Sequence, residues 1–259
     1  IISVNLSTGA KRMAAKQVIV KRLASIENFG SMDILCSDKT GTITEGKVKL
    51  KDTLDVEGNP SKKVRQYAWL NASMQQGFNN PIDEAICAIP HDTENTYRVK
   101  TEIPYDFIRK RLTVQVENEQ GSFVITKGAL NNILTVCDRV ELPTGEISQM
   151  SEKKEDIIGQ YEQLSNNGFR TLGVAYKSGD GERSFSREDE HGMIFLGFIT
   201  LYDPPKLSVA QTISKLNKLG VKLKIITGDT ALVARSLAIQ IEIPSPRILT
   251  GAELMKMSN

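Results

Sequence analysis

Two short apolar runs in the sequence each stop at a polar loop. The first, "ILCSD", ends at Asp38 and continues as Lys-Thr-Gly, and the second, "VKLKIIT", ends at Thr227 and continues as Gly-Asp. Short apolar runs bounded by turn residues are typical of buried strands. A helical pattern, "ALVARSLAIQI", follows the second run, as expected for a parallel sheet. If the two strands are neighbours, Asp38 and Thr227 share the edge of the sheet where ligands collect.

The rest of the pattern predicts one basic helix, a mixed central region and a further helix. Apolar positions recur at helical spacing among Lys and Arg from about residue 7 to residue 29. In the central region, "NEQG" separates two β-rich runs and predicts a hairpin over 111–128. The other expected strands lie at 47–56, 170–176 and 193–201, and the expected helices at 60–74, 151–167 and 207–219.

Pro204 and Pro205 mark a second change of pattern. Consecutive prolines prevent regular hydrogen-bonded structure and stiffen the backbone, so we expect a domain boundary there. Because the apolar runs before and after the central region have the same character, we expect one sheet that is split by an insertion. The predicted domains are residues 1–50, 51–201 and 202–259.

Composition narrows the class of protein. The 259 residues are 40% hydrophobic and 25% charged, with a formal net charge of +2, as in a soluble globular protein of one or two domains. This near-neutral balance argues against a nucleic-acid partner, and the basic cluster at 109–111 is too local to change that. No apolar run reaches the roughly 18 residues of a membrane-spanning helix. The chain is therefore not expected to cross a membrane itself, and its abrupt ends suggest a piece of a longer protein.

Asp38 is the first candidate for chemistry. Two roles are open for Asp38: it caps a turn, or it is a nucleophile beside a loop that holds a phosphoryl group. The loop contributes backbone N–H groups, the hydroxyls of Thr40 and Thr42 and the ammonium of Lys39. At the second strand end, Thr227, Gly228 and Asp229 suggest a similar loop, with Asp229 as a plain helix N-cap being the alternative.

Four motifs in this order resemble one family. "SDKTGTIT", "KGA", "DPPK" and "TGD" are similar to the P-type cation-transporting ATPases, and "NPIDEAI" and "PYDFIRKRLTVQV" point to the magnesium-transporting (type IIIB) branch. The resemblance covers essentially the whole chain. It implies an α/β fold: a split HAD-like (Rossmannoid) parallel-sheet phosphorylation domain, incomplete here, with an inserted α+β nucleotide-binding domain on an antiparallel sheet. Residues 1–50 would also include a stalk helix.

The resemblance also implies roles at the strand ends. Asp38 would accept phosphate from ATP, and Thr40 would offer its carbonyl to Mg²⁺ beside the Asp38 carboxylate. Related phosphatases carry a second aspartate where this chain has Thr40, so the missing acid favours a long-lived phosphoenzyme. The family's further Mg²⁺ ligand lies in a Gly-Asp-Gly motif expected beyond residue 259, whereas the Gly-Asp-Gly around Asp180 is interpreted as a turn. The implied catalytic residues are Asp38, Lys39, Thr40, Thr227, Gly228 and Asp229.

Within the insertion, the resemblance implies an ATP pocket. Lys127 and Gly128 belong to "KGA", although an isolated hairpin lysine is usually solvated. Tyr105 would stack on adenine where many members have Phe, and Asp83 would accept from the adenine amino group or would simply begin a helix. Lys110 and Arg170 would face the phosphates. Asp203, Pro204, Pro205 and Lys206 would form a hinge.

The leading hypothesis is therefore the catalytic part of an ATP-driven cation pump that uses ATP and Mg²⁺. Its partners would be ATP and the transmembrane and actuator domains of the same polypeptide, at the cytoplasmic face of a bacterial or archaeal cell membrane. Without the further metal ligand, the chain alone is expected to be inactive. The alternatives are a HAD-superfamily phosphatase, which Thr40 argues against, and a non-catalytic nucleotide-binding module.

Overall fold

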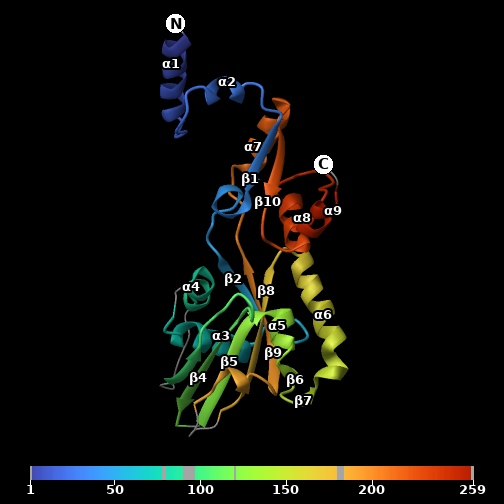
Figure 1. Cartoon of the computed structure of the whole chain (residues 1–259). Coiled ribbons are helices and arrows are strands. Elements are labelled where there is room, and N and C mark those ends of the chain that lie inside the picture. Colours follow the sequence, from blue (N-terminus) through green and yellow to red (C-terminus); the bar gives the residue numbers. More distant parts are fainter. Residues whose placement is uncertain (1, 78–79, 90–96, 120, 180–183, 258–259) are drawn as a thin grey trace. The chain divides into compact units, whose positions relative to one another are not determined.

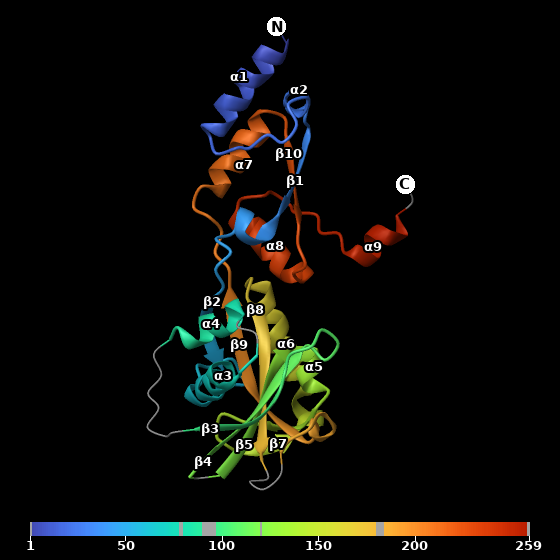
Figure 2. The same ribbon diagram turned by 60° about the vertical axis from the view of Figure 1, so that its left-hand side comes forward.

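The fold is taken from a computed structural model that describes residues 2–77, 80–89, 97–119, 121–179 and 184–257. The chain forms two compact units, shown as ribbons in Figures 1 and 2. Unit 1 comprises Ile1–Ile43 and Lys206–Thr227, and unit 2 comprises Thr44–Pro205 and Gly228–Asn259. Each unit is therefore built from two separate segments of the chain.

Unit 1 is organised around two parallel strands. Strand β1 pairs in parallel with β10, with Ile34 opposite Lys222 and Asp38 opposite Ile226. Helix α7 packs against β10, and Val209 and Ile213 on this helix are buried. The elements of unit 1 are α1 (Ile2–Ala14), α2 (Ser25–Phe29), β1 (Ile34–Asp38), η1 (Lys39–Ile43), α7 (Val209–Lys218) and β10 (Lys222–Ile226).

Two expectations for this unit are wrong. The basic helix expected over about 7–29 is two helices, because α1 ends at Ala14 and α2 begins at Ser25. Between them lies the β-branched run 18–20, whose side chains lose rotamer freedom in a helix. The strand at Ile34 is not buried: exposed and half-buried residues alternate along it, since only two strands form this sheet within the described residues.

Unit 2 is built on an eight-stranded sheet. The strand order is β3-β4-β5-β8-β9-β6-β7, with β2 pairing with β9, and only the β6–β9 pair is parallel. This confirms the mixed α/β class and the antiparallel sheet expected for the insertion. The strands are β2 (Lys49–Leu54), β3 (Arg98–Ile103), β4 (Arg111–Asn118), β5 (Gly121–Ala129), β6 (Cys137–Glu141), β7 (Ile147–Gln149), β8 (Arg170–Ser178) and β9 (Met193–Tyr202).

Helices cover both faces of this sheet. The side chain of Ser61 accepts from the Val64 N–H at the start of α3, and Asn80 caps α4, whose first residue is Pro81. Helices α8 and α9 begin in the same way, at Thr230 and Thr250, whereas α5 and α6 begin without a side-chain cap. The helices of unit 2 are α3 (Lys62–Met74), α4 (Pro81–Cys87), α5 (Leu130–Leu134), α6 (Met150–Asn166), η2 (Arg187–Asp189), α8 (Ala231–Gln240) and α9 (Gly251–Lys256).

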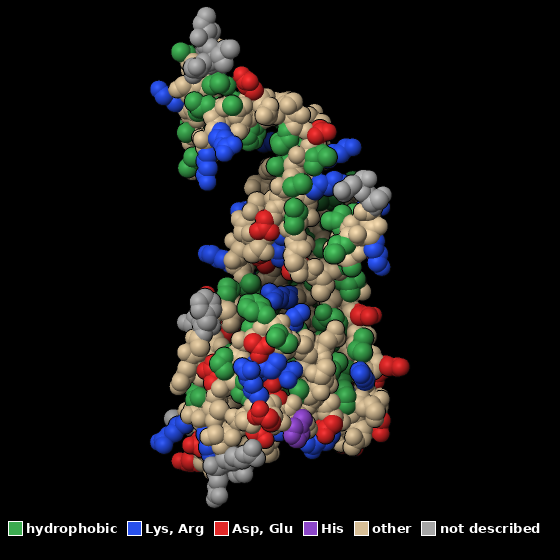
Figure 3. Space-filling model, viewed as in Figure 1, with side chains coloured by type: hydrophobic (Ala, Val, Ile, Leu, Met, Phe, Trp, Pro, Cys, Tyr) green, Lys and Arg blue, Asp and Glu red, His purple; other side chains and the backbone are tan. Residues whose placement is uncertain are grey.

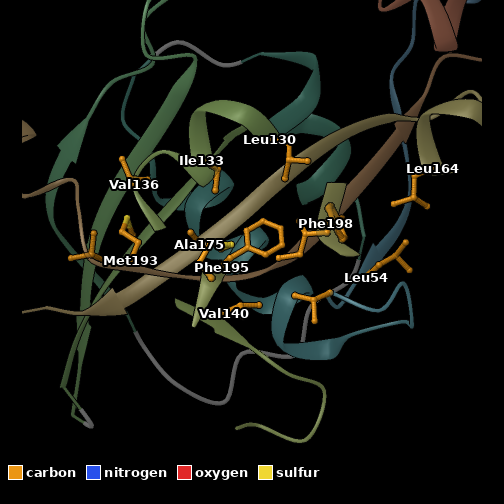
Figure 4. Packing of buried hydrophobic residues seen from close by; sticks show 14 of the residues in the cluster. Leu54, Leu130, Ile133, Val136, Val140, Leu164, Ala175, Met193, Phe195 and Phe198 are labelled. Carbon is orange, nitrogen blue, oxygen red and sulfur yellow. The ribbon is translucent and has the colours of Figure 1, made fainter. Parts of the chain in front are cut away.

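Two hydrophobic clusters hold the layers together. One contains Leu130 and Ile133 of α5 and Ile157 and Leu164 of α6, packed on the sheet around Phe195 (Figure 4). The other packs residues of α3 and α4 against the opposite face, where Val114, Ile125 and Ile199 point. Strand β9 contributes to both clusters, which explains its nearly continuous apolar sequence.

The pattern located most elements correctly. The hairpin at 111–128, the strands near 47–56, 170–176 and 193–201, and the helices near 60–74, 151–167 and 207–219 are confirmed within a few residues. Asp229 is not the N-cap of the following helix, because Thr230 occupies that position and accepts from the Val233 N–H. The turn expected around Asp180 lies outside the described residues. None of the described helices is long and apolar enough to span a bilayer.

Candidate functional site

Asp38 and Thr227 lie at one edge of the two-stranded sheet in unit 1. Asp38 ends β1, and its register partner Ile226 ends β10, so Thr227 follows directly beyond the same edge. Two parallel strands necessarily present their carboxyl ends together. The two strands that end near Asp38 and Thr227 are therefore neighbours, as the shared site expected from the sequence requires. Gly228 and Asp229 come next in the chain, between this edge and Thr230.

The chain leaves Asp38 through a tight turn. The backbone angles are φ −75° and ψ 124° at Thr40 and φ 74° and ψ −11° at Gly41, which are the values of a type II turn. A positive φ at the second central position favours glycine. The Lys39 N–H donates to Asp38 Oδ1 at 2.8 Å, so the carboxylate lies against the start of the turn. Asp38 itself is exposed.

The oxygen groups of this loop suit a hard divalent cation. The Asp38 carboxylate and the carbonyl of Thr40 are the ligand types that Mg²⁺ prefers, and Mg²⁺ commonly takes only one or two protein ligands beside substrate phosphates. No group of three or more His, Cys, Asp or Glu side chains with metal-site geometry occurs among the described residues. The loop thus fits a cation that is shared with a phosphate better than a cage made by the protein alone.

In unit 2, the residues expected to bind nucleotide gather at one edge of the large sheet. Strand β4 begins where β5 ends, with Arg111 opposite Gly128, and β8 begins beside the end of β5, with Leu172 opposite Ala129. Lys110, which directly precedes β4, Gly128 on β5 and Arg170 on β8 therefore lie at the same end of three neighbouring strands. Tyr105 lies in the loop that leads from β3 into β4 at the same edge.

Lys127 is buried in a polar cluster and is not a solvated hairpin lysine. Its side chain is 6% exposed, and its Nζ forms an ion pair with Asp83 Oδ1 and donates to Asn71 Oδ1 at 2.7 Å. Burial lowers the pKa of the Lys127 ammonium below its usual value, and the Asp83 carboxylate opposes that shift. Two residues predicted separately, 44 positions apart in the sequence, are thus in direct contact.

Asp83 has a dense set of partners. Its Oδ2 accepts from Gln75 Nε2 and from Asn80 Nδ2, each at 2.5 Å, in addition to the ion pair of Oδ1 with Lys127. The residue also belongs to the first turn of α4, so both roles weighed for it from the sequence are compatible with its position. An adenine amino group would have to displace one of the present donors.

Gly128 allows two backbone segments to come close. A Cβ at this position would lie 2.4 Å from the Lys110 carbonyl oxygen and 2.7 Å from Arg111 Cα. That carbonyl accepts from the Ala129 N–H at 3.0 Å. Lys110 has a positive φ of 50° and an exposed side chain, with no ion-pair partner among the residues that the structure describes. The "KGA" and "RKR" motifs therefore form one local structure.

Aromatic side chains stand exposed in the loop beside Lys110. Tyr105 is 48% exposed and Phe107 is 87% exposed, and their rings meet edge to face with centroids 5.7 Å apart. An exposed ring near cationic groups is suited to stacking on a base. Arg170 is also exposed, at the start of β8. Phe107 was not singled out from the sequence, although its spacing from Tyr105 could have suggested it.

Two buried polar residues were missed by the sequence reasoning. Asn71 is fully buried, and its Nδ2 donates to the carbonyls of Leu112 (3.2 Å) and Ile125 (2.8 Å) on adjacent strands. Glu190 is 6% exposed and accepts from arginines of the "RKR" motif. An isolated Asn in a helix and a Glu in a polar loop carry no signal of burial in the sequence.

The "DPPK" segment is hydrogen-bonded to the turn after Asp38 and to the residues that follow this turn. In unit 2, Asp203 accepts from Thr44 Oγ1 at 2.5 Å and from the Gly46 N–H at 3.0 Å, and the Pro204 carbonyl accepts from the Glu45 N–H. In unit 1, Lys206 Nζ donates to the Gly41 carbonyl at 2.7 Å. Thr44 and Pro205 form an isolated antiparallel bridge.

Charges of both signs are interspersed on the face of the molecule drawn in Figure 3. Figure 3 shows Lys and Arg side chains next to Asp and Glu side chains, without a broad field of one sign on the face drawn. Arg109 and Arg111 of the basic cluster are paired with Glu190.

Comparison with known proteins identifies the family. The model of the P-type ATPase cytoplasmic domain N matches residues 70–208, more than half of the chain. The chain belongs to the P-type ATPases, which are ion-translocating ATP hydrolases.

Several curated relatives resemble the chain over its full length. A magnesium-transporting ATPase, P-type 1, of Salmonella typhimurium is 36% identical over 269 residues, which cover 100% of this chain and 30% of the relative. The Escherichia coli (strain K12) protein of the same description is 35% identical with the same coverage. A putative cation-transporting ATPase of Methanocaldococcus jannaschii is 33% identical over 99% of this chain and 29% of its own length. The chain thus spans about 30% of the relatives it matches.

Proposed function

We propose that unit 2 binds ATP at the sheet edge formed by β4, β5 and β8. The observation that supports this is the register of these strands, which brings Lys110, Gly128 and Arg170 to one edge beside the loop of Tyr105. Fixed cations there offset the charge of a polyphosphate, and the exposed ring of Tyr105 stacks on the base. Lys127 and Asp83 line the interior end of the pocket and exchange part of their mutual contacts for the nucleotide.

In the whole protein, we propose that Asp38 becomes an aspartyl-phosphate. An Asp38 carboxylate oxygen attacks the γ-phosphorus of ATP, the new oxygen–phosphorus bond forms as the bond to the β,γ-bridging oxygen breaks, and ADP leaves. Lys39, Thr227, Gly228 and Asp229 are proposed to hold the transferred group through the ammonium, the hydroxyl, backbone N–H groups and, for Asp229, a bound cation. Thr40 supplies no general base, so attack of water on the phosphoenzyme is slow.

The residues proposed to hold Mg²⁺ are Asp38, through its carboxylate, and Thr40, through its carbonyl. When bound, the ion neutralises charge between the carboxylate and the incoming phosphate. The segment Asp203, Pro204, Pro205 and Lys206 is proposed to act as the hinge that lets the nucleotide reach Asp38. The names of the relatives suggest magnesium as the transported ion. The matched family model describes a cytoplasmic domain, which supports the cytoplasmic face of a membrane as the proposed location. Because the chain spans only about 30% of these relatives, the remainder of the same polypeptide is the proposed partner.

ATP binding is tested by an NMR titration of the 259-residue chain. We expect shifts at Tyr105, Lys127 and Arg170, and weaker binding by Lys110→Met, since that side chain is an exposed cation at the proposed phosphate end. Lys154→Met, which removes an exposed cation from α6, is the matched control and should bind as the wild type does. Shifts scattered away from this edge, or equal binding by both variants, would contradict the proposed pocket.

Phosphorylation is tested in the full-length parent protein. We expect incorporation of hydroxylamine-sensitive phosphate from ATP, abolished by Asp38→Asn, because an amide cannot serve as the nucleophile. Asp33→Asn is the control: Asp33 is also exposed and lies just before β1, but it is five residues from the proposed nucleophile. A parent protein that still incorporates acyl phosphate with Asp38→Asn would refute this assignment.

A further inference from the structure

The loop between β3 and β4 holds Tyr105 and Lys110, two of the residues proposed to bind nucleotide, yet both side chains are exposed and make few contacts of their own. Something else must keep this loop in one conformation. The residues that flank Tyr105 and Lys110 in the sequence make more contacts. Two of them, Arg109 and Arg111, donate hydrogen bonds to the carboxylate of Glu190, about 80 residues away in the sequence.

Glu190 receives donors from three residues. Its Oε1 accepts from Arg109 Nη1 at 2.8 Å and from Thr113 Oγ1 at 2.6 Å, and its Oε2 accepts from Arg111 Nε at 3.0 Å. The side chain of Glu190 is 1% exposed, and those of Arg109 and Arg111 are 14% and 12% exposed. Such desolvated, charge-assisted bonds are the stronger class of hydrogen bonds.

Arg109, which is bound to Glu190, also binds the two residues on either side of Tyr105. Its Nη2 donates to the Pro104 carbonyl at 2.5 Å, and its Nε pairs with the Asp106 carboxylate. Asp106 also accepts from the Arg109 N–H at 2.7 Å and from the Ile108 N–H at 2.9 Å. Tyr105 is therefore flanked on both sides by residues that the Arg109 guanidinium holds.

Lys110 is positioned in the same way. It lies between Arg109 and Arg111, both of which are bound to Glu190, and its backbone is held at a positive φ of 50°. The carboxylates of Glu190 and Asp106 offset the charges of the two arginines. The "RKR" motif thus presents a single outward cation to a phosphate, that of Lys110.

We propose that Glu190 is a positioning residue for nucleotide binding: through Arg109 and Arg111 it fixes the 104–110 loop so that Tyr105 and Lys110 face one ligand. Glu190 touches no nucleotide itself. The inference rests on the proposed function for the ligand, but its structural part concerns the loop alone.

The loop is tested without ligand by amide hydrogen exchange. Glu190→Gln keeps the shape of the side chain but leaves two arginines without their shared charge, so the amides of Lys110 and Ala129 should exchange about tenfold faster relative to the rest of β4 and β5. The control is Glu141→Gln: Glu141 is 8% exposed, accepts from Lys63 Nζ at 2.6 Å and from the Tyr176 hydroxyl, and lies on β6. It should leave the loop amides unchanged.

The ligand arm uses ATP and inorganic tripolyphosphate in calorimetric titrations of the same variants. Glu190→Gln should bind both about tenfold more weakly, the change expected when a displaced Lys110 loses one charge-assisted contact to the phosphates. Glu141→Gln should bind both as the wild type does. If Glu190→Gln does not fold, Arg109→Lys, which keeps the charge but not the fork, should give the same loosening of the loop.

The outcomes separate the two proposals. Suppose that the wild type binds ATP, and that Glu190→Gln changes neither the hydrogen-exchange rates of the loop amides nor the affinity for ATP. This result would overturn the role of Glu190 and would not affect the proposed pocket. Equal loosening by Glu190→Gln and Glu141→Gln would also overturn it, since it would indicate general destabilisation. A wild type that binds no ATP while Glu190→Gln loosens only the loop would refute the pocket and retain the positioning role.

Discussion

Gly128 of the "KGA" motif is the residue that the backbone of the "RKR" motif approaches most closely. We expect Gly128→Ala to destabilise unit 2 by about 2–4 kcal/mol, because its Cβ would lie 2.4 Å from a backbone oxygen, which cannot move as a side chain can. Urea unfolding would measure the change in the free energy of unfolding.

The control for this change is Gly159→Ala in α6. A Cβ at Gly159 meets nothing within 4 Å, so alanine there should stabilise the helix by about 0.5–1 kcal/mol. Similar effects of the two substitutions would contradict the close approach of Lys110 to β5.

Single residues also show what the sequence could not predict. Lys127 and Asp83 were each recognised by a motif, but their ion pair joins α4 to β5, and no local pattern encodes such a tertiary contact. The solvated alternative for Lys127 is wrong because Asn71 and Asp83 together provide the partners that a buried ammonium requires. Asn71 and Glu190 had no motif, so their roles became visible only from their contacts.

At the scale of elements, the 104–110 loop should be sensitive to acid. The Arg109 N–H, followed by the Arg109 side chain, holds the pKa of Asp106 below the 3.8 of an ordinary aspartate. Because the folded pKa is depressed, the stabilisation is present above about pH 3.8 and is lost as the pH falls through the folded value. In an NMR pH titration, the amides of Ile108 and Arg109 should therefore report a transition below pH 3.8.

The Asp106→Asn variant checks the cause of that transition. With no carboxylate to protonate at position 106, the Ile108 and Arg109 amides of the variant should show no such step. A transition at an unchanged pH in the variant would mean that another group loosens the loop.

Elements were predicted well where the periodicity was strong. The hairpin and β9 were recognised because β-branched and apolar residues are concentrated in short runs. The region 7–29 failed because helical spacing of apolar residues was given more weight than the β-branched run 18–20. The sequence could not establish that β1 and β10 pair, so the shared site was expected only if the two strands were neighbours. Pairing between segments almost 190 residues apart is a tertiary property.

At the scale of the whole molecule, the boundaries between the units lie at Ile43/Thr44, Pro205/Lys206 and Thr227/Gly228. A split chain was expected from the similar strand ends at Asp38 and Thr227, and the domain bounds 1–50, 51–201 and 202–259 stay a prediction. The assignment of α8 to unit 2 could not be foreseen, because it depends on the packing of α8 against α6. The structure describes two parallel strands in unit 1, and the larger HAD-like parallel sheet that the family resemblance implies remains a prediction.

The two units differ in how much apolar surface they bury, and this predicts unfolding in two steps. The buried hydrophobic residues of unit 1 are few, with Ile213 and Val221 among them, whereas unit 2 has two large clusters. Since burial of apolar area is the main stabilising term, unit 1 should unfold at the lower urea concentration. Trp69, the single tryptophan, lies in α3 and reports unit 2, and the NMR signal of Leu35 in β1 reports unit 1.

ATP should then move only one of these steps. A ligand stabilises the state that binds it by RT ln(1 + [L]/Kd), about 2.7 kcal/mol at a hundredfold excess over Kd, and the proposed pocket lies wholly in unit 2. The Trp69 transition should therefore shift to higher urea while the Leu35 transition stays in place, and Lys110→Met should reduce the shift because it weakens binding. If both probes moved together, the units would be one cooperative body, and the free energy of ATP binding would stabilise the strand that carries Asp38 as well as the pocket itself.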